Sequence, residues 1–254
     1  MAPILKLDKV TKIYRRGRNE VVTALRKVSL EVSPGEILMV IGPSGSGKTT
    51  LLNVLSGLDK PTEGKILFNL SNAHEDFKAL PQIKEILDTD DFPKGKEFVD
   101  ITQWDERLLT YYRRYNVGFI FQSWELIPTL KAVENVESSL YPSNIPSPLI
   151  RERAIKLLRK VGLLDKEYAY PDQLSGGEQQ RVAICRALIK EPKLIFADEP
   201  TGNLDTQTSK DIMLLFQKLN EQGITIVLVT HEPDIAAYTQ RIIRMRDGKI
   251  EAIA

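Results

Sequence analysis

The feature that most constrains this chain is the stretch GPSGSGKTT, residues 42–50, which directly follows the apolar run EILMVI. It has the spacing G-x-x-x-x-G-K-S/T, with Gly42, Gly47, Lys48 and Thr49 at the defining positions. Glycine and serine leave the backbone bare, so its amide N–H groups can surround a phosphate chain, and the following helix adds its positive N-terminal end. The apolar strand before the loop and the helical run KTTLLNVLSG after it therefore predict a phosphate-binding loop.

This loop assigns roles to its residues. Lys48 is expected to reach the β- and γ-phosphates of a nucleoside triphosphate, and the Thr49 hydroxyl is expected to bind Mg²⁺. The predicted phosphate-binding set is Gly42, Pro43, Ser44, Gly45, Ser46, Gly47, Lys48, Thr49 and Thr50. The alternative is a glycine-rich turn that fits the pattern by chance, and the strand and helix on either side argue against it.

Three further apolar runs end in polar residues. They are VGFIF before Gln122, KLIFA before Asp198 and Glu199, and ITIVLVT before His231. Helical patterns lie between them, at 151–161, 176–190 and 207–220. Alternating apolar strands and helices predict an α/β fold with a mostly parallel sheet, as in a P-loop NTPase core. Because ligands bind beyond the carboxyl ends of such strands, these residues and Gly42 are expected to share one edge.

The two acidic residues that follow KLIFA are expected to have different roles. Asp198 is expected to position Mg²⁺, and Glu199 to act as the general base that polarises the attacking water. The alternative for both is a solvated turn ahead of Pro200. A lone histidine such as His231 is more often a buried, satisfied residue, but its place at the end of an apolar strand in this set favours a site role.

The segment LSGGEQQR, residues 174–181, predicts a second anion site. Ser175 and Glu178 have the spacing of a capping box, and Gly176 and Gly177 leave the first helical amides bare. A γ-phosphate does not need two such cradles from one chain. We therefore expect two chains arranged head to tail, each placing SGGE against the nucleotide of the other. The alternative is a helix cap and nothing more.

Composition narrows the choice of partners and compartment. The 254 residues carry a net charge of +1, with no basic tail and no cluster of five or more Lys and Arg, so nucleic acid is not expected as a partner. Cys185 is the single cysteine, which indicates a reducing compartment, and we expect it to be a core residue without a redox role. No apolar run approaches the roughly 18–20 residues of a membrane span. The start, MAPILKLDKV, is not a signal peptide.

Taken together, these motifs resemble the nucleotide-binding subunits of ABC transporters. The matching segments are GPSGSGKT, the glutamine in FQSWELIPTL, LSGGEQQR, LIFADEP, TGNLD and the histidine in THEP. They span almost the whole chain in the order that the family has. VGFIFQSWELIPTLKAVENV and ADEPTGNLD are similar to the branch with the macrolide-exporter, lipoprotein-release and cell-division (FtsE) ATPases.

The resemblance implies further roles. Tyr14 matches the aromatic residue that stacks on adenine, with an ordinary strand-end tyrosine as the alternative. Gln122 would sense Mg²⁺ and the attacking water where the membrane partner docks, and His231 would contact the γ-phosphate. Asp205 would cross the dimer interface. ATP would join two copies of the chain, and hydrolysis would release them and drive integral membrane permease subunits from the cytoplasmic face of the membrane.

The resemblance also implies a domain organisation. The chain is expected to be one ABC ATPase domain, with a nucleotide-binding core at 1–122 and 191–254 that carries an N-terminal antiparallel β subdomain. A helical subdomain with the LSGGE motif is expected at 123–190.

Residues 70–97 depart from the family pattern and are expected to form a small helical insert between two antiparallel strands. Asn72 is placed to cap its start and Pro81 to open a second turn. The apolar positions at helical spacing are Phe77, Leu80, Ile83, Ile86 and Leu87. The insert is either a peripheral elaboration packed on its own subdomain or a docking surface for a partner.

Three functions remain open at this stage. The first is the ATPase subunit of a transporter of the export, lipoprotein-release or mechanotransmission type, with a separately encoded permease. The second is an FtsE-like ATPase that controls an extracytoplasmic or cell-wall effector through a membrane partner. The third, a soluble ABC ATPase of repair or translation, is disfavoured because the chain has neither long coiled coils nor a second cassette. Transported substrate and direction would reside in the membrane subunits.

Overall fold

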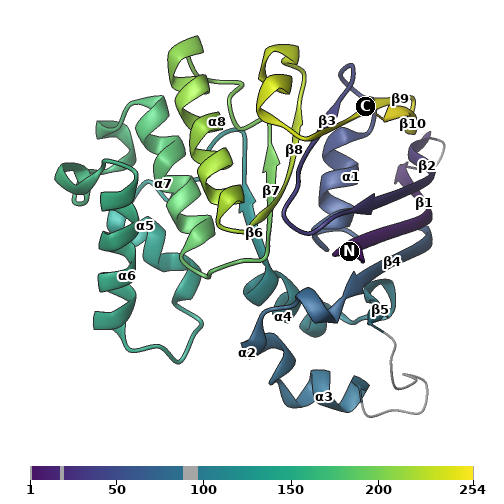
Figure 1. Ribbon diagram of the computed structural model, residues 1–254, viewed down its shortest axis with the longest axis horizontal. Coiled ribbons are helices and arrows are strands. Elements are labelled where there is room, and N and C mark those ends of the chain that lie inside the picture. Colours follow the sequence, from purple (N-terminus) through teal and green to yellow (C-terminus); the bar gives the residue numbers. More distant parts are fainter. Residues whose placement is uncertain (1, 18–19, 88–96, 254) are drawn as a thin grey trace.

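The N-terminal strands form an antiparallel sheet at one end of the molecule (Figure 1). The computed structural model describes residues 2–17, 20–87 and 97–253. The sheet has the order β2-β1-β4-β5. Its strands are β1 (Leu5–Arg16), β2 (Glu20–Val32), β4 (Glu63–Asn69) and β5 (Phe98–Asp100). Alternating residues such as Leu5 and Leu7 are buried on one face, which is the pattern of a sheet with one solvated side.

The second sheet has six strands in the order β10-β9-β3-β8-β7-β6, and all its pairs are parallel except β9 with β10. The strands are β3 (Ile37–Ile41), β6 (Val117–Ile120), β7 (Leu194–Asp198), β8 (Thr225–Thr230), β9 (Arg241–Arg246) and β10 (Lys249–Ile253). The apolar runs that predicted parallel strands thus form adjacent, covered strands. The predicted α/β fold with a mostly parallel sheet is confirmed.

Helices cover this sheet, and a group of helices lies at the end of the molecule opposite to the antiparallel sheet (Figure 1). Helix α1 (Lys48–Leu55) lies between the two sheets, and its apolar residues join one core with both of them. Outside the insert, the further helices are α4 (Glu106–Asn116), α5 (Ala132–Glu137), α6 (Ser147–Lys160), α7 (Gly176–Leu188) and α8 (Thr206–Glu221). Helices α7 and α8 cover the far face of the parallel sheet, and α5, α6 and α7 enclose a smaller core of their own.

Short 3₁₀ segments connect these elements. They are η1 (Leu70–Asn72), η2 (Ile101–Gln103), η3 (Ser138–Leu140), η4 (Leu164–Lys166), η5 (Pro171–Gln173) and η6 (Pro233–Tyr238).

The insert lies between β4 and β5, as predicted, but the prediction that it begins with a helix capped by Asn72 is wrong. Ala73 and His74 are extended, and helix α2 (Glu75–Lys78) starts from His74, whose Nδ1 accepts from the Asp76 N–H at 3.2 Å. The competing cap arises because His74 supplies a ring nitrogen at the point where the backbone turns. Pro81 does open the second helix, α3 (Pro81–Leu87).

The described part of the insert is packed into the core. Phe77 and Ile83 are buried, and Leu80 packs against them from a partly exposed position. The Phe77 ring lies 6.0 Å from that of Trp104 and 6.3 Å from that of Phe68, measured between ring centroids. These contacts support a structural role for this part of the insert. The predicted apolar positions Ile86 and Leu87 and the segment 88–96 lie outside the described side chains, and docking stays a prediction.

This packing predicts that Phe77→Ala destabilises the whole domain. Removal of a buried aromatic ring leaves a cavity and costs about 3–5 kcal/mol in the free energy of unfolding. Equilibrium unfolding in urea measures it, with Lys84→Ala as the control because Lys84 is an exposed residue of the same insert. A loss below about 1 kcal/mol, within the usual range of surface substitutions, would show that the insert lies outside the cooperative core.

Candidate nucleotide-binding site

The loop between β3 and α1 is shaped by two glycines that no other residue can replace. A Cβ at Gly42 would lie 2.2 Å from the carbonyl oxygen of Met245, and one at Gly47 would lie 2.4 Å from that of Ala24. Gly47 also has a φ of 101°, which L-residues rarely adopt, and it caps α1. Close backbone approach on two sides therefore makes the loop narrow and bare.

Lys48 lies over this loop. Its Nζ donates to the carbonyl oxygens of Gly42 at 2.8 Å and Pro43 at 3.1 Å, so the amine is held at the centre of the cradle. The Ser46 hydroxyl is buried and lacks a hydrogen-bond partner among the described residues. Free donors and one amine around a concave loop fit a phosphate chain.

Thr49 and Asp198 converge from the two neighbouring segments. The Thr49 hydroxyl donates to Asp198 Oδ1 at 3.3 Å, so an alcohol oxygen and a carboxylate oxygen lie side by side. Burial raises the pKa of Asp198, although the Thr49 hydrogen bond partly opposes this rise. A divalent cation would favour the ionised form, and a site of few protein oxygens completed by substrate phosphates is typical of Mg²⁺. The donor set thus fits Mg²⁺.

Glu199 is held between two other predicted site residues. Its Oε2 accepts from Gln122 Nε2 at 3.0 Å, and its Oε1 lies 3.2 Å from His231 Nδ1. The backbone of Glu199 has a φ of 43°, outside the extended region of the preceding strand, and its N–H donates to the Val229 carbonyl. This turn directs the side chain of Glu199 away from Asp198 and toward Gln122 and His231.

Part of this set borders a cavity of about 920 Å³, whose described lining does not include Gln122 or Asp198. Its wall includes Tyr14, Lys48, Thr49, Glu199 and His231, so four separate elements bring predicted residues together. The sequence analysis missed part of the wall, namely Val22, Thr23, Ala24, Arg26, Asp247 and Gly248. These belong to β2 and to the turn between β9 and β10, and they carry no motif from which they could have been predicted.

Tyr14 is fixed by two partners that the sequence analysis also missed. Its hydroxyl donates to Asp59 Oδ2 at 2.8 Å, and Lys12 Nζ binds Asp59 Oδ1 at 2.6 Å. The Lys12 amine also lies 4.9 Å from the centre of the Tyr14 ring. Burial disfavours the charge of Asp59, but Lys12 and Tyr14 outweigh it and hold the pKa of Asp59 below its usual value.

The second predicted anion site lies elsewhere. Ser175 and Glu178 form a complete capping box, in which the Ser175 N–H donates to Glu178 Oε2 at 2.7 Å. Of the described residues that line the 920 Å³ cavity, none comes from Ser175–Glu178 or from Asp205. One chain therefore does not bring its two candidate phosphate cradles together.

Thr208 connects the LSGGE segment to Asp205. A Cβ on Gly177 would lie 2.4 Å from the Thr208 methyl group, so this glycine is also required by packing within the chain. Asp205 caps α8, accepts from the N–H groups of Gln207 and Thr208 at 3.0 Å, and accepts from the Thr208 hydroxyl at 2.5 Å. Hydrogen bonds from Thr208 lower the pKa of Asp205 and keep it ionised.

Cys185 is a buried, free thiol in the helical core, as expected. Burial raises the pKa of the Cys185 thiol far above its ordinary value, so it stays protonated and unreactive.

The fold and site define the class of the protein. A bare loop that follows a buried strand and opens a helix, at the carboxyl edge of a mostly parallel sheet, is typical of P-loop nucleotide-binding proteins. The family model described as ABC transporter matches residues 25–202. The chain belongs to this family and is an ATP-binding, ATP-hydrolysing cassette.

Two relatives indicate the branch. The lipoprotein-releasing system ATP-binding protein LolD of Aquifex aeolicus is 44% identical over 250 residues, covering 98% of this chain and 97% of that protein. The macrolide export ATP-binding/permease protein MacB of Syntrophobacter fumaroxidans is 44% identical over 254 residues, covering 98% of this chain but only 31% of that protein. The predicted similarity to the macrolide-exporter and lipoprotein-release branch is confirmed.

A solved structure shows the same fold. It is an ATP-binding cassette of Methanocaldococcus jannaschii, described as dimeric in a post-hydrolysis state with ADP and Pi bound. It matches with a TM-score of 0.80 at 40% identity, covering 98% of this chain and 97% of that one.

Within the described ranges of our chain, no helix is both long and apolar enough to cross a membrane.

The contacts of Tyr14 predict that Asp59 affects the affinity for the nucleotide and does not affect the rate of the chemical step. Asp59→Ala should raise the KM for ATP by about 5-fold at unchanged kcat, because a lost hydrogen bond to a charged group costs roughly 1 kcal/mol of ring positioning. Steady-state ATPase kinetics measure the split, with Asp172→Ala as an exposed control. A fall in kcat at constant KM would contradict the assignment.

Proposed function

We propose that the chain hydrolyses MgATP with Glu199 as the general base. The observation that carries this is the carboxylate of Glu199, held by Gln122 at 3.0 Å and His231 at 3.2 Å at the open end of the phosphate loop. Glu199 accepts a proton from water as the water oxygen bonds to the γ-phosphorus, while the bond from that phosphorus to the β–γ bridging oxygen breaks and ADP leaves. Gln122 fixes the direction of the Glu199 carboxylate. His231 lies on the opposite side of Glu199 and contacts the γ-phosphate.

The phosphate chain lies in the cradle of Gly42–Thr50. Lys48 leaves the loop carbonyls to neutralise the β- and γ-phosphates, and the loop amides donate to the remaining oxygens. Thr49, Asp198 and Gln122 would hold Mg²⁺, which would neutralise the charge of the phosphates. Tyr14 stacks on the base at the outer end of the cavity.

A second copy of the chain completes the site. The support is the separation within one chain of the LSGGE segment from the phosphate cavity, together with a relative that was solved as a dimer. In a head-to-tail pair, Ser175, Gly176, Gly177 and Glu178 of each chain face the γ-phosphate held by the other. Asp205 lies at the same interface, and Thr208 connects it to the LSGGE helix, because Thr208 donates to Asp205 and lies against Gly177.

The ATPase cycle drives a separately encoded permease in the membrane. The support is the similarity to LolD, named for lipoprotein release, and to MacB, whose name includes both ATP-binding and permease functions.

The chain is cytoplasmic and peripheral on the cytoplasmic face of the membrane, and nucleic acid is not among its partners. Residues 123–190 form the helical subdomain, and 1–122 with 191–254 form the core.

The base assignment predicts a trapped dimer. Glu199→Gln should bind ATP normally and lose about 10²–10⁴-fold in kcat, because an amide cannot accept the proton. With ATP and Mg²⁺, multi-angle light scattering should show a stable dimer that separates after ATP is removed. Glu221→Gln, an exposed change on α8, is the matched control and should behave as the unaltered chain. A variant that stays monomeric with ATP would contradict the two-chain site.

The partner assignment predicts co-purification with a membrane protein. The tagged chain, captured from detergent-solubilised native membranes, should bring a multi-pass protein in stoichiometric amount, identified by mass spectrometry. A large extracytoplasmic domain that binds a cell-wall effector would favour the FtsE-like function over export or lipoprotein release. Recovery of soluble proteins, ribosomes or DNA alone would overturn the membrane assignment and leave the ATPase chemistry standing.

A further inference from the structure

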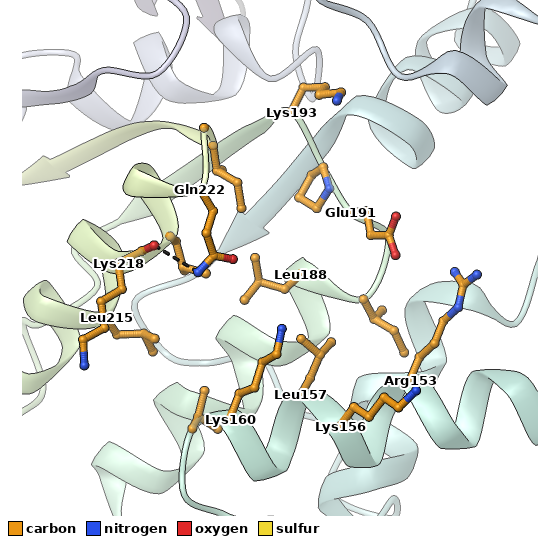
Figure 2. A pocket seen from close by; sticks show the side chains of 16 residues that line it. Arg153, Lys156, Leu157, Lys160, Leu188, Glu191, Lys193, Leu215, Lys218 and Gln222 are labelled. Atoms are coloured by element: carbon orange, nitrogen blue, oxygen red, sulfur yellow. Dashed lines mark hydrogen bonds between the residues drawn. The ribbon is translucent and has the colours of Figure 1, made fainter.

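A second cavity lies away from the nucleotide site, and Figure 2 shows it from close by. It has a volume of about 600 Å³ and lies between α6, the end of α7 and the end of α8. Pro192 and Lys193 before β7, and Gly223 and Ile224 before β8, form its back wall. The cavity is therefore at the amino ends of the parallel strands, whereas the phosphate loop is at their carboxyl ends. Its described lining shares no residue with the nucleotide cavity.

The floor of this cavity is apolar and belongs to the core. Leu188 and Leu219 are buried there, and Leu157, Leu215 and Ile224 are partly buried against the same cluster. These side chains are held by packing on the parallel sheet, so the floor is preformed. Ligand sites are typically such preformed apolar cavities of about 300–1,000 Å³ with a few polar groups.

The rim carries a concentration of positive charge. The five cationic residues of the lining are Arg153, Lys156, Lys160, Lys193 and Lys218, against the single acid Glu191. The whole chain is nearly neutral, with 35 Lys and Arg against 34 Asp and Glu, so this ratio is a local property. Within the described part of the chain only Lys156 among these five forms an ion pair, with Glu152 at 2.7 Å. A cleft lined by one sign of charge attracts the opposite charge.

Helix α6 shows how the rim is built. Arg153, Lys156, Leu157 and Lys160 are spaced so that they share one face, which lines the cavity, while Ala154 and Leu158 on the other face are buried in the helical core. In Figure 2, Lys160 extends from α6 toward Leu188 and the middle of the cavity, whereas Lys193 and Lys218 point outward. Lys160 is thus the cation best placed to meet a ligand that lies on the apolar floor.

From the charge and shape of this cavity, we propose that it binds a small anionic amphiphile, with the apolar body on the leucine floor and a carboxylate, sulfonate or phosphate head at Lys160. A concave site of about 600 Å³ has the size of a small-molecule site. The excess of cations selects an anionic head over a cationic one. The proposal does not depend on the assignment of the nucleotide site.

Fluorescence titration with 1-anilinonaphthalene-8-sulfonate, an anionic apolar probe, tests this on the full chain. We expect one saturable probe site that decanoate displaces and that decyltrimethylammonium and MgADP do not. Lys160→Glu should weaken decanoate binding by about tenfold, because an attractive charge becomes a repulsive one. Lys160→Gln should weaken it less. Lys210→Glu is the matched control, since it makes the same charge change at an exposed α8 position outside the cavity.

Four results would overturn the proposal. They are failure of decanoate to displace the probe, displacement by MgADP, equal weakening by Lys160→Glu and Lys210→Glu, and binding of an acidic amphipathic peptide without binding of decanoate. Far-UV circular dichroism and the urea midpoint of each variant establish that Lys160→Glu is folded, so that a loss of binding reports on the cavity.

Discussion

The parallel pairing of β3 with β8 and of β8 with β7 is the constraint on which the site depends. Ile41 pairs with Thr230 and Asp198 with Val229, so three strands end at the same level. The next residues in each strand are Gly42, Glu199 and His231, and no further folding is needed to bring them to one edge. A slip by one residue would move the Asp198 side chain to the other face of the sheet, and burial of the strands disfavours such a slip.

Backbone groups, more than side chains, shape the cavity next to this edge. The carbonyl oxygens of Ala24 and Met245 approach the phosphate loop so closely that only glycine fits at Gly47 and Gly42. Ala24 belongs to the antiparallel sheet and Met245 to β9, so both sheets must be in place before the loop has its shape. The nucleotide site is therefore a product of the whole core, and the aromatic cluster around Phe77 supports it from a distance by holding the antiparallel sheet on α4.

The sequence predicts most of this arrangement because the phosphate loop, the acidic pair and the histidine each follow a long apolar strand. The fold class, the strands and the shared edge follow from that pattern. What it does not predict depends on contacts between segments far apart in the chain. Asp59 carries no signal of its 2.8 Å bond to Tyr14, and Gly177 none of the Thr208 methyl group beneath it. The insert shows that a local feature can also be mispredicted. Because Ala73 and His74 are extended, α2 starts two residues later than predicted, and His74 rather than Asn72 caps it.

Within one chain Glu199 is held between Gln122 and His231, so its neighbours preorganise the proposed base. What a single chain lacks is a second cradle at the open end of its phosphate cavity, because its own LSGGE helix lies elsewhere. On the proposed mechanism, association of two chains is therefore the step that completes the site, and binding energy from ATP is used to join them. The capping box of Ser175 and Glu178 suits this role, since it satisfies the helix end within each chain and keeps the segment ordered before a partner arrives. In an ATPase built in this way, ATP binding would bring two chains together and hydrolysis would separate them. A membrane protein attached to both chains would then be moved by that association.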